Sequence, residues 1–366
     1  MLEIVEWLVV FGFFSTLIGF IIAPVAGLLH QISLAAMICL NTMVDLLSNI
    51  PTGTFYIKRP PLLIIIATYI WLILGLIKPK NVRSIHYAGL FILSCYFSIT
   101  FLQNHGKIKI TFLDVGQGDA TLIEGPKGET ILIDTGPPFY YSSQQAYGDV
   151  ARNILLPVLK SKGINKLDML VISHFDLDHY GALYNLVENI TIGLVIENGH
   201  LPKDIKAVLT KHNIPTYIMN RGDILSYGDD FKLTCFHSGN PYNNLSKNDR
   251  SLVIKLSHKT LDILFTGDIS ETIEYELVRN YKDQLESEIL KVAHHGSNTS
   301  SSSYFLDRVN PMYSIISSGV ENKFNHPHPD ILDRLEKKST VLGTKRHGAI
   351  IVTHDNENMY LNTFLK

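Results

Sequence analysis

The first hundred residues are dominated by long apolar runs, whereas apolar and charged residues alternate over short distances from about residue 105 onward. Residues 7–29, 61–77 and 87–102 have the composition of membrane-spanning helices, since about 20 apolar residues cross a hydrocarbon core. Residues 32–47 are also apolar but contain Asn41 and Asp45, which favours an interfacial or bundle-facing helix. We therefore predict a membrane-embedded helical region over residues 1–104 and a globular domain over residues 105–366.

Basic residues cluster in residues 78–86, between the last two apolar runs. Cytoplasmic loops carry an excess of Lys and Arg, so this turn is expected in the cytoplasm and the globular domain on the outer face of the membrane. Other basic residues lie near the opposite ends of these runs, so the charge difference is small. A role of the helices as a simple anchor stays open.

Short β-branched runs replace the long apolar ones after residue 105. The pattern predicts strands over residues 107–114, 120–124, 130–133, 169–173, 252–256 and 261–265, and a helix over residues 270–282. Strands in meanders with helices inserted between them are typical of two mixed sheets packed face to face with helices outside. The expected fold class is therefore α+β, an αββα sandwich preceded by the transmembrane helices.

Composition limits the chemistry of the globular domain. The three cysteines have no CxxC spacing, which argues against a structural zinc site or a redox centre. The formal net charge of −2 gives no global attraction for nucleic acid. Any DNA contact must come from metal ions or a local patch, such as the basic residues 337, 338, 345 and 346, which are equally typical of a solvated surface.

The strongest chemical signal is the segment from Ser173 to His179, directly after an apolar strand. It contains four potential metal ligands, His174, Asp176, Asp178 and His179, within six positions. A loop at a strand end can fold such residues round a metal ion and leave coordination positions open. A lone histidine there would be structural more often than not, but two histidines and two aspartates favour a metal site.

Further polar residues follow other predicted strands. They are Asp134 after residues 130–133, Asp268 after the Thr-Gly that ends residues 261–267, the pair His294-His295, and His326 in a His-Pro-His-Pro segment. Each alone would be an ordinary turn or surface residue. Together they predict one active-site edge, because the sheets direct these strand ends the same way.

These motifs resemble the metallo-β-lactamase superfamily, and the whole chain resembles the C-terminal part of ComEC-type competence DNA-uptake proteins. The resemblance is carried by Phe-Leu-Asp-Val-Gly-Gln-Gly-Asp119-Ala, Ile-Asp134-Thr-Gly, Ser-His174-Phe-Asp-Leu-Asp-His179, Thr-Gly-Asp268, Lys-Val-Ala-His294-His295-Gly-Ser and His326-Pro-His-Pro. It covers nearly everything after residue 107, and the preceding helices resemble the last membrane segments of the competence channel.

The resemblance implies a site for two divalent metal ions. The implied ligands are His174 and Asp176 for one ion, Asp178 and His179 for the other with His326 or one of His294 and His295, and Asp268 as a bridge. Asp134 is implied to brace the loop. Asp178 would also take part in catalysis, and His294 or His295 could protonate the leaving group or bind the phosphate, or merely pack beneath the site.

Two features depart from the family pattern. The middle residue of the first motif is usually histidine but is Asp176 here, and a further histidine ligand is replaced by the region of Asn248, Asp249 and Ser251. Oxygen ligands move the preference from Zn²⁺ toward Mn²⁺ or Mg²⁺, so Mn²⁺ is favoured over Zn²⁺. A site with fewer imidazoles could also bind its first ion weakly, which leaves a non-catalytic domain open.

The function implied is that of a metal-dependent phosphodiesterase, a DNase, attached to a DNA-uptake channel. It would lie in the bacterial inner membrane with the hydrolase domain outside. Expected partners are DNA, the lipid bilayer, and other competence proteins or a separate channel subunit. Two alternatives stay open: a membrane-anchored metallo-hydrolase of esters, thioesters or lactams, and a transporter part that binds DNA without cleaving it.

Overall fold

The computed structural model describes residues 12–16, 18, 23–48, 60–77, 82–104, 106–142, 145–228, 230–239, 245–320, 322–355 and 358–365. The chain divides into two compact units, Met1–Tyr56 and Ile57–Lys366. The change from helices to strands falls between Asn104 and Ile108, where the sequence pattern also changes. The expected domain limit at residues 104 and 105 stays a prediction.

Among the described residues of the N-terminal unit, a continuous helix covers the point where the sequence predicts two segments to meet. Helix α2 (Ala23–Ser48) runs without interruption through the predicted gap between residues 29 and 32. Pro24 lies at its start, where a proline is tolerated because the first amides of a helix have no intrahelical acceptor. No helix breaker occurs between residues 29 and 32, so the expected division there is wrong. Much of the first apolar run lies outside the described residues.

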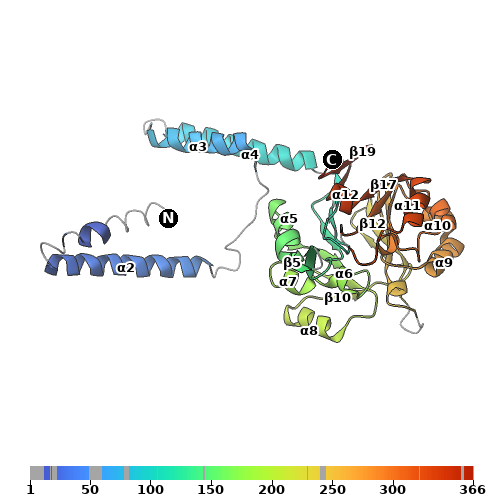
Figure 1. The fold of residues 1–366 in the computed structure, drawn as a ribbon. Helices are drawn as coiled ribbons and strands as arrows, with labels where there is room; N and C mark the ends of the chain where they lie inside the picture. Colours follow the sequence, from blue (N-terminus) through green and yellow to red (C-terminus); the bar gives the residue numbers. More distant parts are fainter. Residues whose placement is uncertain are drawn as a thin grey trace. The chain divides into compact units, whose positions relative to one another are not determined.

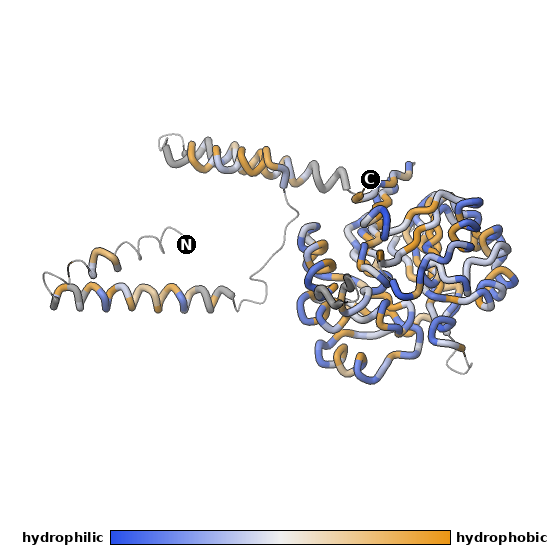
Figure 2. Tube along the Cα trace, in the orientation of Figure 1, coloured by the Kyte–Doolittle hydropathy of each residue, from blue (hydrophilic) through white to orange (hydrophobic). Residues whose placement is uncertain are grey.

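The two later apolar segments form the helices α3 (Leu62–Ile77) and α4 (Val82–Asn104). The rings of Trp71 and His86 meet edge to face with centroids 5.8 Å apart, which confirms the expected hairpin. Apolar residues recur along all three helices in Figure 2. Within the described residues, however, no helix combines the length and the apolarity that a membrane span requires.

Two sheets make up the globular part (Figure 1). The first has the order β10 (Thr216–Ile218), β9 (Val195–Glu197), β7 (Met169–Val171), β3 (Thr130–Ile133), β2 (Thr121–Glu124), β1 (Ile108–Phe112), β18 (Ile350–His354) and β19 (Met359–Thr363). The second has the order β11 (Ile224–Ser226), β12 (Phe231–His237), β13 (Val253–His258), β14 (Leu261–Phe265), β15 (Ile289–Lys291), β16 (Tyr313–Ile316) and β17 (Thr340–Gly343). Two short ladders, β4 (Phe139–Ser142) with β5 (Gln145–Asp149) and β6 (Lys166–Leu167) with β8 (Thr191–Ile192), flank them.

Alternation along the strands places one shared core between the sheets. On β3, Ile131 and Ile133 face this core, whereas Leu132 faces the helices outside. Successive strand residues point to opposite faces, so this period of two covers both sides of each sheet. Phe112 of the first sheet stacks on Phe265 of the second, with ring centroids 6.1 Å apart.

Helices cover the outer face of each sheet. The first sheet packs against α5 (Leu156–Ser161), α7 (Leu183–Val187) and α8 (Lys203–Lys211), with α6 (Leu177–Tyr180) nearby. The second packs against α9 (Glu271–Tyr281), α10 (Ser303–Val309) and α11 (Pro329–Glu336), and α12 (Thr344–His347) follows β17. The expected αββα sandwich is confirmed. Because β3 runs parallel to β7, and β14, β15 and β16 run parallel to one another, the carboxyl ends of these strands share an edge in each sheet.

Candidate metal centre

The first sheet contributes the loop that follows β7. Asp134, just beyond β3, accepts hydrogen bonds at 2.7 Å from both the backbone N–H and the hydroxyl of Ser173. The same carboxylate lies 2.8 Å from Nδ1 of His179. Asp134 is therefore placed to brace the ligand loop, the role that the family resemblance implied for it.

The second sheet contributes Asp268 and the histidine pair. The backbone N–H of Asp268 donates to the Ser251 hydroxyl at 3.0 Å. Gly267 has a φ of +51°, and a Cβ there would approach the Cβ of Ser251 to 2.6 Å, so glycine is needed for this close turn. His294 and His295 follow β15 with φ of 49° and 54°.

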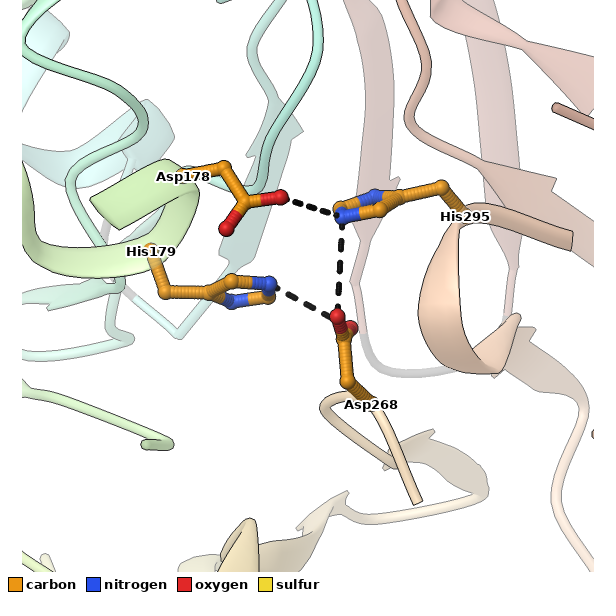
Figure 3. Close-up of side chains that lie close together, drawn as sticks. All are labelled: Asp178, His179, Asp268 and His295. Carbon is orange, nitrogen blue, oxygen red and sulfur yellow. Dashed lines mark hydrogen bonds and ion pairs between the residues drawn. The ribbon is translucent and has the colours of Figure 1, made fainter. Parts of the chain in front are cut away.

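Four of these side chains converge on one point (Figure 3). We call Asp178, His179, Asp268 and His295 the four-residue cluster; one ligand atom from each lies within 4.8 Å of those of the others. Nε2 of His179 is 3.2 Å from Oδ1 of Asp268, and Nε2 of His295 is 3.2 Å from Oδ2 of Asp178. Two members follow strands of the first sheet and two follow strands of the second.

The donor atoms of this cluster suit a divalent metal ion. Nε2 of His179 and Oδ1 of Asp268 are buried and form an ion pair with each other, but within the described part of the chain neither makes a hydrogen bond of good geometry, and Nε2 of His174 also lacks one. Leaving buried polar atoms unsatisfied is unfavourable unless another group binds them. Imidazole nitrogens and carboxylate oxygens are ordinary ligands of Zn²⁺ and Mn²⁺, so the residues fit the implied metal.

The first predicted ion has a looser set of residues. Nε2 of His174 lies 3.9 Å from Asp268 and 4.0 Å from Asp176. Asp176 is one-third exposed and also lies 3.3 Å from the ammonium of Lys247. The structure therefore brings His174 next to the bridging candidate Asp268, and it leaves Asp176 at the rim, outside the four-residue cluster.

The late histidines separate into different places. His295 is almost fully buried and completes the four-residue cluster. His294 is partly exposed, with Nε2 3.9 Å from Asp268 and 3.3 Å from the amide nitrogen of Asn248. His326 lies further out, its ring centroid 5.6 Å from that of His294 and 6.5 Å from that of His295. Of the three histidines that the resemblance left open for this place, His295 is the one that the structure brings into the cluster.

Electrostatics hold the carboxylates of the cluster in their ionised form. Burial alone would raise the pKa of Asp178, but the hydrogen bond from His295 and the positive charge of His179 lower it to about 2. Burial would lower the pKa of His295, but the charges of Asp268 and Asp119 raise it to about 10. An ionised carboxylate pair attracts cations, and protons must leave the imidazoles when a metal binds.

Sequence reasoning missed a buried ion pair beneath the cluster. Nζ of Lys291 lies 2.7 Å from Oδ2 of Asp119, and both side chains are less than one-tenth exposed. Asp119 was noted only as part of a motif. A lysine inside the apolar run Ile289-Leu-Lys291-Val-Ala was the available signal, because a buried lysine needs a partner.

The basic residues 337, 338, 345 and 346 are weaker candidates for a nucleic-acid contact than their charge alone indicates. Lys337 pairs with Asp333 at 2.6 Å, and Lys338 pairs with Asp307. Lys345 and Arg346 lie in the short helix α12. The ion pairs favour the reading of Lys337 and Lys338 as a solvated surface.

Comparison with known proteins places this geometry in a family. A sequence model of the Metallo-beta-lactamase superfamily matches residues 113–320. The chain is 30% identical over 341 residues to ComE operon protein 3 of Bacillus subtilis, covering 87% of this chain and 42% of that protein. It is also 30% identical over 242 residues to Competence protein ComA of Neisseria gonorrhoeae, covering 66% of this chain and 31% of that one.

The chain thus spans less than half the length of these two relatives. Among solved structures, CmlA, a diiron β-hydroxylase from Streptomyces venezuelae, aligns with a TM-score of 0.44 and 13% identity, covering 68% of this chain and 54% of that one. The family model spans more than half of the chain and includes Asp134, the loop from His174 to His179, Asp268 and His295. The chain belongs to the metallo-beta-lactamase superfamily.

Proposed function

We propose that this chain is the metal-dependent phosphodiesterase part of a bacterial DNA-uptake system, in which it degrades or trims DNA during natural transformation. The observation that carries the proposal is the four-residue cluster, with its unsatisfied buried donor atoms, in a superfamily of metal-dependent hydrolases. The relatives named ComE operon protein 3 and Competence protein ComA connect this hydrolase with competence.

Each residue of the centre has a distinct task in this proposal. The cluster, together with His174 and Asp176, would hold the divalent ions, which would supply Lewis acidity toward a phosphodiester and an attacking water. Asp178 is the most exposed member of the cluster, at 30% of its side chain, so its carboxylate can also accept a proton from that water. His294, exposed by 27% beside Asp268, is placed to donate a proton to the leaving oxygen.

The test is a nuclease assay of the 366-residue chain, metal-depleted and then reloaded with Mn²⁺, Mg²⁺ or Zn²⁺. Substrates are 5′- and 3′-labelled single-stranded and double-stranded DNA, with nitrocefin and a thioester in parallel. Asp268→Asn should abolish DNA cleavage. The matched control Asp283→Asn, at a side chain that is 88% exposed and pairs with Arg308 outside the cluster, should cleave like the parent chain.

Two outcomes would overturn the proposal in different directions. Hydrolysis of nitrocefin or the thioester without cleavage of DNA would assign the chain to the metallo-hydrolases of small acyl compounds. DNA binding without hydrolysis, with every metal, would assign it a non-catalytic part in the transporter. The choice of Mn²⁺ over Zn²⁺ is tested in the same assay with Asp176→His, which should shift the preferred ion toward Zn²⁺ because imidazole is a softer ligand than carboxylate.

We further propose that the chain lies in the inner membrane as a multi-pass protein with the hydrolase domain outside. The support is the apolar composition of the first hundred residues and the basic turn over residues 78–86. A domain that processes incoming DNA is useful only on the side from which DNA arrives. An alkaline phosphatase fused after Lys366 should be active and a green fluorescent protein dark, and the reverse pattern would overturn this topology.

We also propose that the chain acts together with further protein, because relatives named for competence match it. Other competence proteins or a separate channel subunit would then be its partners, together with DNA and lipid. Copurification of the epitope-tagged chain from competent cells, compared with the same cells grown without competence, tests this partnership. A chain that supports DNA passage alone in proteoliposomes would overturn it.

A further inference from the structure

We propose that the buried pair of Asp119 and Lys291 positions the metal ligands of the two sheets relative to each other. Asp119 lies in the connection between β1 and β2 of the first sheet, and Lys291 is the last residue of β15 in the second. Their charged atoms are 2.7 Å apart, and the side chains of Asp119 and Lys291 are 7% and 3% exposed. The proposal rests on the proposed metal site, whose ligand geometry the pair would control.

Asp119 contacts one cluster member from each sheet. Its backbone N–H donates to the carbonyl oxygen of Asp178 at 3.1 Å. Its side-chain Oδ1 lies 3.4 Å from Nδ1 of His295. Gly118, with a φ of +142°, permits this approach, because a Cβ at that position would lie 2.3 Å from the same carbonyl of Asp178. One residue thus fixes the backbone of one ligand and the ring of another.

The contacts of His295 define which ring nitrogen faces the metal. Nδ1 lies 3.0 Å from the carbonyl oxygen of Ser317 and 3.4 Å from the carboxylate of Asp119, so both neighbours of this nitrogen are acceptors. The proton of the neutral ring therefore belongs on Nδ1, and Nε2, which faces Asp178 and Asp268, keeps a lone pair for a cation.

The first sheet has a matching arrangement. Nδ1 of His179 lies 2.8 Å from Asp134, and its Nε2 faces Asp268. Each histidine of the four-residue cluster therefore has a buried carboxylate at Nδ1. The difference is that the carboxylate of Asp119 is itself held by a cation from the opposite sheet, whereas Asp134 is held by the hydrogen bonds of Ser173.

Among the described residues, the buried ammonium of Lys291 has Asp119 as its one ionic partner. Its ammonium contacts Asp119 and, at 3.2 Å, the carbonyl of Val292. Burying a lysine is unfavourable, and a buried ion pair is weak evidence of stabilisation because desolvation opposes the attraction. This pair joins the two sheets beneath the ligands, and Asp119 contacts cluster members from both sheets. A role in positioning those ligands explains why the pair is buried there.

The experiment measures Mn²⁺ binding by equilibrium dialysis, together with the melting temperature of the metal-free chain. Lys291→Met leaves Asp119 without its cation, and we expect the Kd for Mn²⁺ to rise about 10- to 100-fold, as for other partners of metal-bound histidines. The double variant Asp119→Leu with Lys291→Met removes both charges together, which commonly preserves stability. It should melt near the parent temperature and still bind Mn²⁺ at least tenfold more weakly.

The matched control is Lys255→Met. Lys255 is also a buried lysine of the second sheet, and its ammonium lies 2.7 Å from Asp262, but it does not contact the cluster. This variant should lose stability and keep the parent Kd. If the double variant has a Kd for Mn²⁺ within twofold of the parent value, the positioning role of the pair is overturned but the metal site is not. A parent chain that binds no Mn²⁺ would overturn the metal site and the proposed function with it.

Discussion

Two neighbouring histidines have different surroundings because of their backbone. His294 and His295 both have positive φ, a conformation that costs a non-glycine residue about 1–2 kcal/mol. Such strain persists only where the surrounding contacts enforce it, and it is common at functional sites. The turn sends His295 into the buried cluster and leaves His294 exposed at the rim, so the two residues can serve different steps.

This separation predicts different losses for the two positions. His294→Asn should bind Mn²⁺ like the parent but lower kcat on bis-p-nitrophenyl phosphate by about 100-fold or more, the usual contribution of a general acid. His295→Asn should lose Mn²⁺ binding. Asparagine is the replacement of choice because it tolerates positive φ. Loss of Mn²⁺ binding in His294→Asn would contradict the assignment.

The sequence motif could identify the histidine pair but not which member is a ligand. Spacing along the chain contains no information about a left-handed turn, and for that reason the choice among His294, His295 and His326 stayed open. The loop from His174 to His179 was predictable, because its residues follow one strand closely. Asp119 and Lys291 were not, since they are 172 positions apart and meet only when the sheets pack.

A second buried histidine pair lies away from the metal centre. Nδ1 of His258 is 3.0 Å from Nδ1 of His354, and burial, followed by the charge of His354, lowers the pKa of His258 to about 4. His258 is therefore neutral in the folded chain, whereas in the unfolded chain it takes up a proton below about pH 6.5. Its contribution to stability is complete above pH 6.5 and is lost as the pH falls toward 4.

We expect the free energy of unfolding of the parent chain to fall between pH 7 and pH 4, with up to about 3 kcal/mol arising from His258, since one pKa unit corresponds to about 1.4 kcal/mol. His258→Gln should show a shallower decrease over the same interval. Denaturant titrations at several pH values measure this, with His212→Gln, at the end of α8, as control. An equal pH dependence in the parent and in His258→Gln would contradict the prediction.

At the scale of elements, strands buried on both faces were predictable from their short β-branched runs. This holds for β1, β2, β3, β13 and β14, in which all residues but one are buried. The short strand β10 was not found, because all three of its residues are exposed and it lies at the edge of its sheet. Helix α9 was predicted to within one residue at each end.

The hairpin of α3 and α4 depends on a small residue at the contact. A Cβ at Gly89 would lie 2.2 Å from the Trp71 ring, so Gly89→Val should displace this indole. In a Trp7→Phe background Trp71 is the remaining tryptophan, and its emission maximum should shift. Gly27→Val in α2 is the matched control, since nothing lies within 4 Å of a Cβ there. An unchanged emission maximum in Gly89→Val would contradict the packing.

At the scale of the whole globular part, the four-residue cluster draws its ligands from both sheets. An ion bound there connects the two halves of the sandwich and binds the folded state only. Binding of this kind stabilises by about 2.7 kcal/mol when the free ion is at 100 times its Kd. The fold class was predictable from the order of strands and helices. That one metal site takes ligands from both sheets was not, because it depends on how the sheets pack.

Chelation should therefore lower the melting temperature of the parent chain. EDTA is expected to shift the near-ultraviolet circular dichroism transition downward by several degrees, and Mn²⁺ in excess should restore it. Asp268→Asn removes the carboxylate that faces both His179 and His295. The melting transition of this variant should not respond to EDTA or to added Mn²⁺. A parent transition that is insensitive to EDTA after exhaustive dialysis would contradict the role of the ion.

The pairing of β1 with β18 has a consequence for synthesis. Phe112 of β1 lies opposite Ile350 of β18. The free edge of β1, which is synthesised early, is therefore covered only after β18, near the end of the chain, has been synthesised. Pairings this distant in sequence form slowly, and an uncovered edge strand can pair with another molecule. A chain ended after residue 349 contains every cluster residue, yet it should aggregate on refolding, as light scattering would detect. The residues of the four-residue cluster are thus synthesised before the strand that covers the edge of β1.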